Sequence, residues 1–262
     1  MPPVSVITSR SHSLVQRCRS LAAGRGEPGE VLLDGAHVIE AALAGGIAVE
    51  TILTDSRVSS VISAARRANI TIVEGSAGVL EAASPVKTPT GVVAIASWSP
   101  LSVEDVLTKA AGVVVGLVDV QDPGNVGATI RSAHALGAGG VLALGTTADP
   151  AGWRAIRGAM GSTFGVPIAR GDAATAVTLA KRFGYAIAAT TVGKGSLLGE
   201  IEFPNAVIVL LGNEGAGLSE GIRSHGDMAI KVPMQTGIES LNVAVTAALV
   251  LWEARRHRQR RP

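Results

Sequence analysis

Several residue types and segments that define common protein classes are scarce in this sequence. Its 262 residues include one cysteine, Cys18, which excludes an intrachain disulfide framework and any zinc site built from several cysteines. No apolar run approaches the about eighteen residues that a membrane-spanning helix needs, and Met1–Arg10 lacks the apolar core of a secretory signal. These absences predict a cytoplasmic protein without membrane contact.

Aromatic residues are also few. They make up 3% of the chain, whereas apolar residues as a whole make up 47%. The interior must therefore be built from small and aliphatic side chains, which is typical of α/β folds with buried parallel strands. A chain of this length buries roughly 70–75% of its unfolded surface, so its core needs no disulfide or other covalent cross-link.

The common nucleotide- and metal-binding signatures are missing. There is no GxxxxGK[ST] phosphate loop, no GxGxxG after the first strand of either half, and no GxSxG elbow. A nicotinamide-dependent oxidoreductase is therefore disfavoured. No metal site is expected either, because the histidines are scattered without metal-ligand spacing, at His12, His37, His134, His225 and His257.

The net charge of +2 is unevenly placed. The first 26 residues hold four arginines and no acid, and the last ten hold five arginines against Glu253 alone. Basic ends attract polyanions such as RNA, although solvated tails have the same composition. Charge alone does not choose between these readings.

Aliphatic runs alternate with helix-like stretches along the whole chain, which predicts βα repetition. We expect one unit at residues 1–98, a linker at 99–111 and a second unit at 112–262. In the second unit the expected strands are 113–118, 140–144, 166–168, 185–189, 207–211 and 228–232. The expected helices there are 125–136, 152–160, 173–182, 219–225 and 241–256.

Three loops that follow expected strands could carry chemistry. The first, 118–131, reads VDVQDPGNVGATIR, in which Pro123 and Gly124 turn the chain. Asn125 is expected as the N-cap of the next helix, and Arg131 could reach back toward its anion-binding N-terminus. The alternative is a capped turn with a surface arginine.

The second loop, 210–219, reads LLGNEGAGLS and holds Glu214 among three glycines, which let the backbone approach a ligand closely. The third, 232–245, reads VPMQTGIESLNVAV. Its Ser240 and Asn242 are either N-caps or groups that orient a substrate. Because the carboxyl ends of parallel strands share one edge, we expect all three loops to line one crevice.

These segments resemble motifs one, two and three of the SpoU/TrmH-type RNA methyltransferases, members of the SPOUT superfamily. The resemblance rests on the segments DPGNVGATIR, GNEGAGLS and SLNVAV, and RAIRGAMGSTF at 154–164 is similar to the segment before motif two. The resemblance implies an α/β methyltransferase domain with a parallel sheet and a deep trefoil knot. It also implies a homodimer with the active site near the subunit interface.

The first half resembles the smaller α/β, ribosomal-protein-like substrate-binding domain of extended family members. This resemblance rests on VLLDGAHVIEAAL at 31–43 and SPVKTPTGVVAIA at 84–96, with Asp34 as the acid before the glycine. Extended members of this kind methylate large-subunit ribosomal RNA and include thiostrepton-resistance enzymes. Transfer-RNA members remain possible relatives.

The implied reaction moves a methyl group from S-adenosylmethionine to a ribose 2′-hydroxyl of RNA. The resemblance places the cofactor on the backbone at Gly212, Val232 and Leu241, with Thr190 at the pocket edge. It assigns catalysis and substrate positioning to Asn125, Arg131, Glu214, Ser240 and Asn242. Because a guanidinium stays protonated in proteins, we expect Arg131 to bind the target phosphate and stabilise the developing alkoxide rather than act as a base.

Two other functions are compatible with these motifs. One is transfer-RNA methylation in place of ribosomal-RNA methylation. The other is an RNA-binding protein that keeps this scaffold without activity, which the three intact motifs disfavour. The target nucleotide and the role of the basic C-terminal tail do not follow from the sequence.

Overall fold

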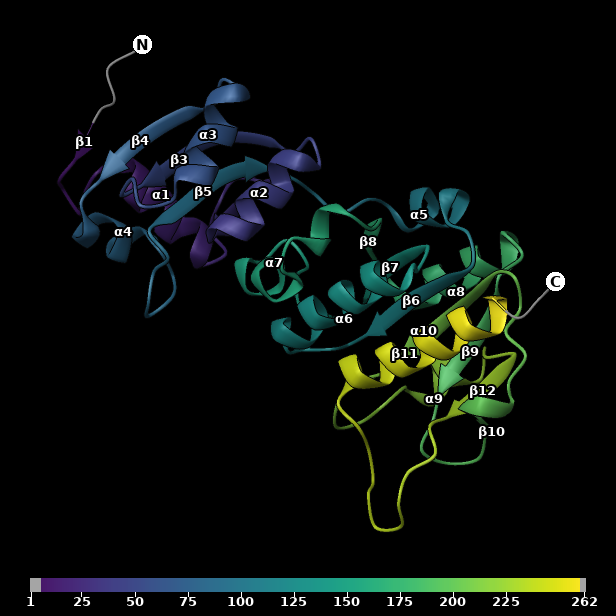
Figure 1. The fold of residues 1–262 in the computed structure, drawn as a ribbon. Helices are drawn as coiled ribbons and strands as arrows, with labels where there is room; N and C mark the ends of the chain where they lie inside the picture. The colour runs from purple at the N-terminus through teal and green to yellow at the C-terminus, as the bar shows by residue number, and fades with distance from the viewer. Residues whose placement is uncertain (1–5, 260–262) are drawn as a thin grey trace. The chain divides into compact units, whose positions relative to one another are not determined.

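The computed structural model describes residues 6–259, which form two compact units (Figure 1). Unit 1 comprises the chain up to residue 99 together with Ala151–Phe164, and unit 2 comprises Pro100–Pro150 and the chain from residue 165 onward. A segment from the middle of the sequence therefore folds with the N-terminal unit. No helix among residues 6–259 is long and apolar enough to cross a membrane.

Unit 1 is built on a five-stranded mixed sheet with strand order β1-β4-β3-β5-β2. Strand β5 runs antiparallel to both of its neighbours, and the other pairs are parallel. The strands are β1 (Val6–Ile7), β2 (Glu30–Asp34), β3 (Ala48–Thr54), β4 (Thr71–Gly75) and β5 (Val92–Ser97).

Helices cover both faces of this sheet, because its strands are apolar on both sides. Along β2, Val31 and Leu33 belong to one buried cluster and Leu32 to the other, as the alternation of strand side chains requires. Helices α2 (Ala36–Ala44) and α3 (Ser59–Arg67) pack into the first cluster, and α1 (Ser13–Ala22) and α4 (Ala77–Ala83) into the second.

A fifth helix, α7 (Trp153–Ala159), covers the edge strand β2. Its Ile156 joins the cluster on one face of the sheet, and its Trp153 packs against the cluster on the other. A covered edge cannot pair with another chain. The helix is followed by the short 3₁₀ turn η1 (Ser162–Phe164), whose Phe164 meets Trp98 edge to face.

Unit 2 contains a seven-stranded sheet in which every pair is parallel, with strand order β10-β12-β9-β11-β6-β7-β8. The strands are β6 (Val113–Val118), β7 (Gly140–Leu144), β8 (Ile168–Gly171), β9 (Ala186–Thr190), β10 (Ser196–Leu197), β11 (Val207–Leu211) and β12 (Met228–Lys231). The central strands β6, β7 and β11 are buried along their whole length.

Helices flank the parallel sheet and leave its carboxyl edge to loops. Helices α5 (Val103–Lys109) and α8 (Ala173–Arg182) bury their apolar faces in one core, while α6 (Pro123–Leu136) packs against the long α10 (Val243–Gln259). The short α9 (Glu220–Arg223) and the 3₁₀ turn η2 (Leu198–Glu200) complete the unit.

The observed sheets confirm the predicted α/β class: a mixed-sheet first unit followed by a parallel-sheet second unit. Three strands, β6, β7 and β11, begin and end where the aliphatic runs predicted. The trefoil knot stays a prediction, because strand order and pairing do not record how the chain threads.

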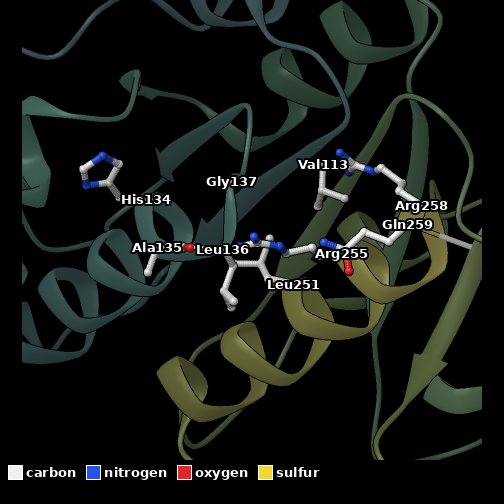
Figure 2. A pocket seen from close by; sticks show the side chains of 9 residues that line it. All are labelled: Val113, His134, Ala135, Leu136, Gly137, Leu251, Arg255, Arg258 and Gln259. Carbon is white, nitrogen blue, oxygen red and sulfur yellow. Dashed lines mark hydrogen bonds between the residues drawn. The ribbon is translucent and has the colours of Figure 1, made fainter.

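The C-terminal half of α10 is anchored at the amino end of β6, where a cavity of about 380 Å³ lies between α10 and the end of α6 (Figure 2). The Arg255 guanidinium donates a hydrogen bond to the Ala135 carbonyl, which is one of the last carbonyls of α6. Arg258 lies over Gly112, where an added Cβ would come within 2.2 Å of its guanidinium. Arg255 therefore joins α10 to α6, and Arg258 covers the residue before β6, at the edge of the sheet opposite to the motif loops.

Candidate active site

A cavity of about 450 Å³ opens at the carboxyl ends of β9, β11 and β12. Four segments line it: the loop after β9, the glycine-rich turn after β11, the loop after β12 and the start of α10. The cavity includes all four residues expected to hold a cofactor, which are Thr190, Gly212, Val232 and Leu241. Ligands of open α/β sheets bind at this position relative to the strands.

The turn after β11 needs its glycines because its backbone folds back on itself. A Cβ at Gly212 would lie 2.1 Å from the carbonyl carbon of Gly217, so a larger residue cannot occupy this position. Gly217 has φ of +67°, which favours glycine. Asn213 fills the turn: its side-chain oxygen accepts hydrogen bonds from the Gly215 and Ala216 amides at 2.9 and 3.2 Å.

The same asparagine ties the turn to the central strand. Its side-chain nitrogen donates to the Asp119 carbonyl at 2.9 Å, directly after β6. Asp119 adopts a left-handed φ of 58° and uses its carboxylate to accept from the Thr146 amide and hydroxyl at 2.8 and 2.9 Å. The carboxyl ends of β6, β7 and β11 are thus fixed by one polar network.

Motifs one, two and three meet through Asn125. Its side-chain nitrogen donates to a Glu214 carboxylate oxygen at 2.8 Å, and its oxygen accepts from the Asn242 side chain at 2.9 Å. Asn125 is half-buried, whereas Glu214 and Asn242 are exposed. Residues from three distant segments therefore form a single hydrogen-bonded chain, Asn242–Asn125–Glu214.

The expectation that Asn125 caps the helix is wrong. Helix α6 begins two residues earlier, at Pro123, and Asp122 is the N-cap, accepting from the Asn125 amide at 2.8 Å. Proline suits the first helical position because its φ is preset and it needs no donor there. Since Asp122 performs the capping, the Asn125 side chain is left to bind Glu214 and Asn242.

For Asn242, the capping role and the site role coexist. Its side-chain oxygen accepts from the Ala244 amide at 2.9 Å and so caps α10, while its nitrogen donates to Asn125. Ser240 is exposed and lines the cavity, as Leu241 does. The loop before α10 therefore supplies both the cavity wall and the end of the hydrogen-bonded chain.

Arg131 lies elsewhere on α6. It is exposed, eight residues after the helix begins, and it is not among the residues that line the cavity. Within residues 6–259 its guanidinium makes no hydrogen bond or ion pair. The structure therefore leaves this side chain available for a ligand without joining it to the Asn125 cluster.

The two units match two known sequence families. Residues 14–94 match the MRM3-like substrate binding domain, and residues 112–252, more than half of the chain, match the SpoU rRNA Methylase family. The chain belongs to the SpoU rRNA methylase family. Its enzyme class is accordingly that of the SpoU RNA 2′-O-methyltransferases.

SpoU relatives align across both units. The 23S rRNA (guanosine(2553)-2′-O)-methyltransferase RlmP of Bacillus subtilis strain 168 is 32% identical over 86% of this chain and 88% of its own length. The 23S rRNA (uridine(2479)-2′-O)-methyltransferase of Streptomyces viridochromogenes is 29% identical over 98% and 94%. The AdoMet-bound rRNA methyltransferase from Sinorhizobium meliloti has a TM-score of 0.87 at 28% identity, over 97% and 98%.

Some polar residues of this SpoU site were not singled out from the sequence. Asp119 and Asn213 stand inside the quoted motifs, but their roles depend on contacts between strands that no local pattern reveals. Glu239 and Arg223 line the cavity, and Arg223 also pairs with Glu220. No cluster of three or more potential metal ligands occurs between residues 6 and 259.

Proposed function

We propose that the protein transfers a methyl group from S-adenosylmethionine to a ribose 2′-hydroxyl of large-subunit ribosomal RNA. The observation that carries this proposal is the Asn242–Asn125–Glu214 chain beside a glycine-lined cavity, within a SpoU-family fold. Full-length relatives named as 23S rRNA 2′-O-methyltransferases support ribosomal over transfer RNA.

The cavity fits S-adenosylmethionine by size and by donor chemistry. Its volume of about 450 Å³ falls within the range of small-ligand sites. Apolar walls at Leu218, Ile230 and Val232 suit an adenine ring, and the tightly folded backbone of the β11 turn offers amides and carbonyls. Two acids, Glu214 and Glu239, complement a cationic sulfonium. When bound, the cofactor supplies an already activated methyl group, so the protein needs to align and desolvate rather than activate the donor.

The remaining work falls to side chains of this chain. Gly212, Val232 and Leu241 hold the cofactor through their backbone, and Thr190, which donates to the Leu210 carbonyl at 3.0 Å, fixes the edge of the pocket. The Asn125 chain orients Glu214 at the cavity wall. Ser240, Asn242 and Arg131 position the substrate. Arg131, whose guanidinium has no competing partner among the described residues, binds the target phosphate and stabilises the developing alkoxide.

This function is tested by changing Arg131→Ala and measuring methyl incorporation into ribosomal RNA with labelled cofactor, followed by mapping of the methylated ribose. We expect the rate to fall by a factor of about 100 or more, the usual cost of removing a charge-stabilising donor. Thermal stabilisation by S-adenosylmethionine stays unchanged. Wild-type turnover in the variant contradicts the assignment of Arg131, and incorporation into transfer RNA alone contradicts the ribosomal target.

We further propose that the protein works as a cytoplasmic homodimer that pairs through α10. Val245, Leu249 and Trp252 are 48%, 38% and 58% exposed and lie on one face of this helix, at helical spacing. An exposed apolar stripe on a helix marks an interaction surface. The first turn of the same helix, at Val243 and Thr246, lines the cavity, so a second copy on the stripe would pack against the helix that forms one wall of the site.

The dimer is tested by the charge substitution Trp252→Lys, with sedimentation velocity as the readout. We expect the variant to sediment as a monomer. The matched control is Leu101→Lys, which also replaces an exposed apolar side chain with lysine, at 42% exposure on the same unit, and should leave the dimer intact. A dimer that survives Trp252→Lys places the interface elsewhere.

A further inference from the structure

Helix α7 of unit 1 carries a surface hollow of about 480 Å³ outside the site described above. Its lining residues are Trp153, Arg154, Arg157, Gly158 and Met160. Two of these are arginines and none is acidic, so the hollow presents positive charge beside an aromatic ring. Met160, 43% exposed, forms an apolar border where α7 ends in a left-handed turn.

Arg154 and Trp153 form a stacked pair. The Arg154 guanidinium carbon lies 4.7 Å from the centre of the Trp153 ring, within cation–π distance. Trp153 is held in place by packing against the sheet and by a hydrogen bond from its indole nitrogen to the Ala22 carbonyl at 3.1 Å. Arg154 itself is exposed and makes no hydrogen bond or ion pair in the described chain. Its planar guanidinium is therefore an exposed stacking surface that is supported by the fixed Trp153 ring.

Arg157 is fixed by a different contact. Its guanidinium pairs with the carboxylate of Asp34, whose side chain is 1% exposed and also accepts a hydrogen bond from Ser84. One terminal nitrogen of Arg157 makes this bond, and its side chain remains 38% exposed. A guanidinium anchored at one nitrogen presents its other donors in a set direction, which suits the oxygens of a phosphate.

We propose that this α7 surface binds a single-stranded segment of the RNA substrate, with an unstacked base on the Arg154–Trp153 pair and an adjacent phosphate on Arg157. The proposal rests on the proposed RNA-methylating function and names part of its substrate recognition. Sequence-tolerant recognition of single strands combines such planar stacking with arginine contacts to the backbone.

RNA fits this surface better than an acidic peptide does. A peptide carboxylate would satisfy Arg157, but it would leave the exposed plane of Arg154 without a partner. A nucleotide supplies both a phosphate and a flat ring a few ångströms apart, matching the neighbouring positions of the two arginines on α7. RNA is therefore the expected occupant of this surface, and the second experiment below compares it with an acidic peptide.

The first experiment uses full-length Arg154→Ala, which removes an exposed side chain and spares the fold. We expect affinity for a ribosomal RNA fragment to fall about tenfold, the loss of one stacked base, with KM for RNA rising and kcat unchanged. The control is Arg67→Ala, which removes the same charge from an exposed position on α3 of the same unit. Equal affinities for RNA in the two variants overturn the proposal.

The second experiment reads the stack directly. In a Trp98→Phe, Trp252→Phe background, Trp153 is the remaining tryptophan, and short oligoadenylate should quench its fluorescence. Adding Arg154→Ala should abolish most of the quenching. No quenching in the parent overturns the proposal, and stronger displacement by an acidic peptide than by RNA overturns the choice of occupant. Because this readout needs no methyl transfer, it separates failure of the α7 surface from failure of the proposed enzyme activity.

Discussion

The two sheets of this protein use their polar residues differently. In the parallel sheet of unit 2, the carboxyl ends of all strands lie at one edge, where the second and third motif loops line a cavity. The first motif loop does not line this cavity as expected, but it joins the other two through Asn125. In the mixed sheet of unit 1, β5 runs against its neighbours, so strand ends are divided between two edges. The acids of unit 1 instead form ion pairs that join elements, such as Asp34 with Arg157 and Glu30 with Arg17.

This contrast explains why the cavity proposed to bind the cofactor lies in unit 2, whereas the surface proposed to bind RNA lies on a helix of unit 1. Parallel topology collects loops at one place, so distant motifs can meet through Asn125. Mixed topology disperses the loops, so the surface proposed to bind RNA lies on the single helix α7. Substitutions that affect only one of the two units therefore test this comparison between them.

The largest effect is expected for Gly212→Ala. The added Cβ would lie 2.1 Å from backbone atoms of Gly217, so the β11 turn has to open and the cavity wall is lost. Thermal stabilisation by S-adenosylmethionine should vanish, as measured by differential scanning fluorimetry. The matched control in the same turn is Gly215→Ala, whose Cβ would meet only Asn213 at 3.5 Å. Retained stabilisation in Gly212→Ala would show that the turn does not form the cofactor wall.

Next comes Arg157→Met, which leaves the buried Asp34 carboxylate without its ionic partner. Unit 1 should lose about 3 kcal/mol of stability, measured by hydrogen exchange of the β2 amides. The second change Asp34→Asn should restore most of this loss, because it removes the unpaired charge. If β2 exchanges no faster in Arg157→Met, the ion pair does not hold α7 on the sheet.

A somewhat smaller effect is expected for Asn125→Ala. The change breaks both hydrogen bonds of the Asn242–Asn125–Glu214 chain but leaves the cap at Asp122 in place. We expect methyl transfer to slow about 100-fold while cofactor stabilisation persists. Loss of cofactor stabilisation instead would assign Asn125 to building the cavity.

The smallest effect concerns Cys18, which is buried in unit 1. Burial raises the pKa of its thiol from 9.0 to about 12, because the thiolate would lose its hydration. The folded state thus favours the neutral thiol, so its stabilising contribution is full below pH 9 and declines as the pH rises toward 12. Denaturant titrations should show wild-type stability falling more steeply than that of Cys18→Ala, by about 1 kcal/mol at pH 10. Equal slopes would contradict this effect.

Much of the fold was predictable because buried parallel strands are unbroken aliphatic runs. Residues 113–118 form β6 and residues 173–182 form α8, each with the same bounds as predicted. The two-residue strands β1 and β10 were not predicted, since two residues carry no periodicity. Their pairing depends on neighbours that are distant in sequence.

The position of the cavity was predictable from the sequence, whereas the contacts of single side chains were less so. The four residues predicted to hold a cofactor line one cavity because they lie at or after the carboxyl ends of strands of one parallel sheet, and their role stays a prediction. Capping by Asp122 was missed because Asn125 is itself a good capping residue, and only the start of the helix at Pro123 decides between them. The pairing of α7 with unit 1 was also missed, since Trp153 and Ala22 lie 131 residues apart.

The discontinuous make-up of unit 1 constrains the order in which the protein can mature during synthesis. When the ribosome has added residue 99, β2 still lacks the helix that covers its edge, and Asp34 still lacks Arg157. The first part of unit 2, Pro100–Pro150, must emerge before Ala151–Phe164 is available to complete the earlier unit. The N-terminal unit, made first, therefore matures only after β6 and β7 have been synthesised, and a fragment ending at residue 99 would expose an edge open to pairing with other chains.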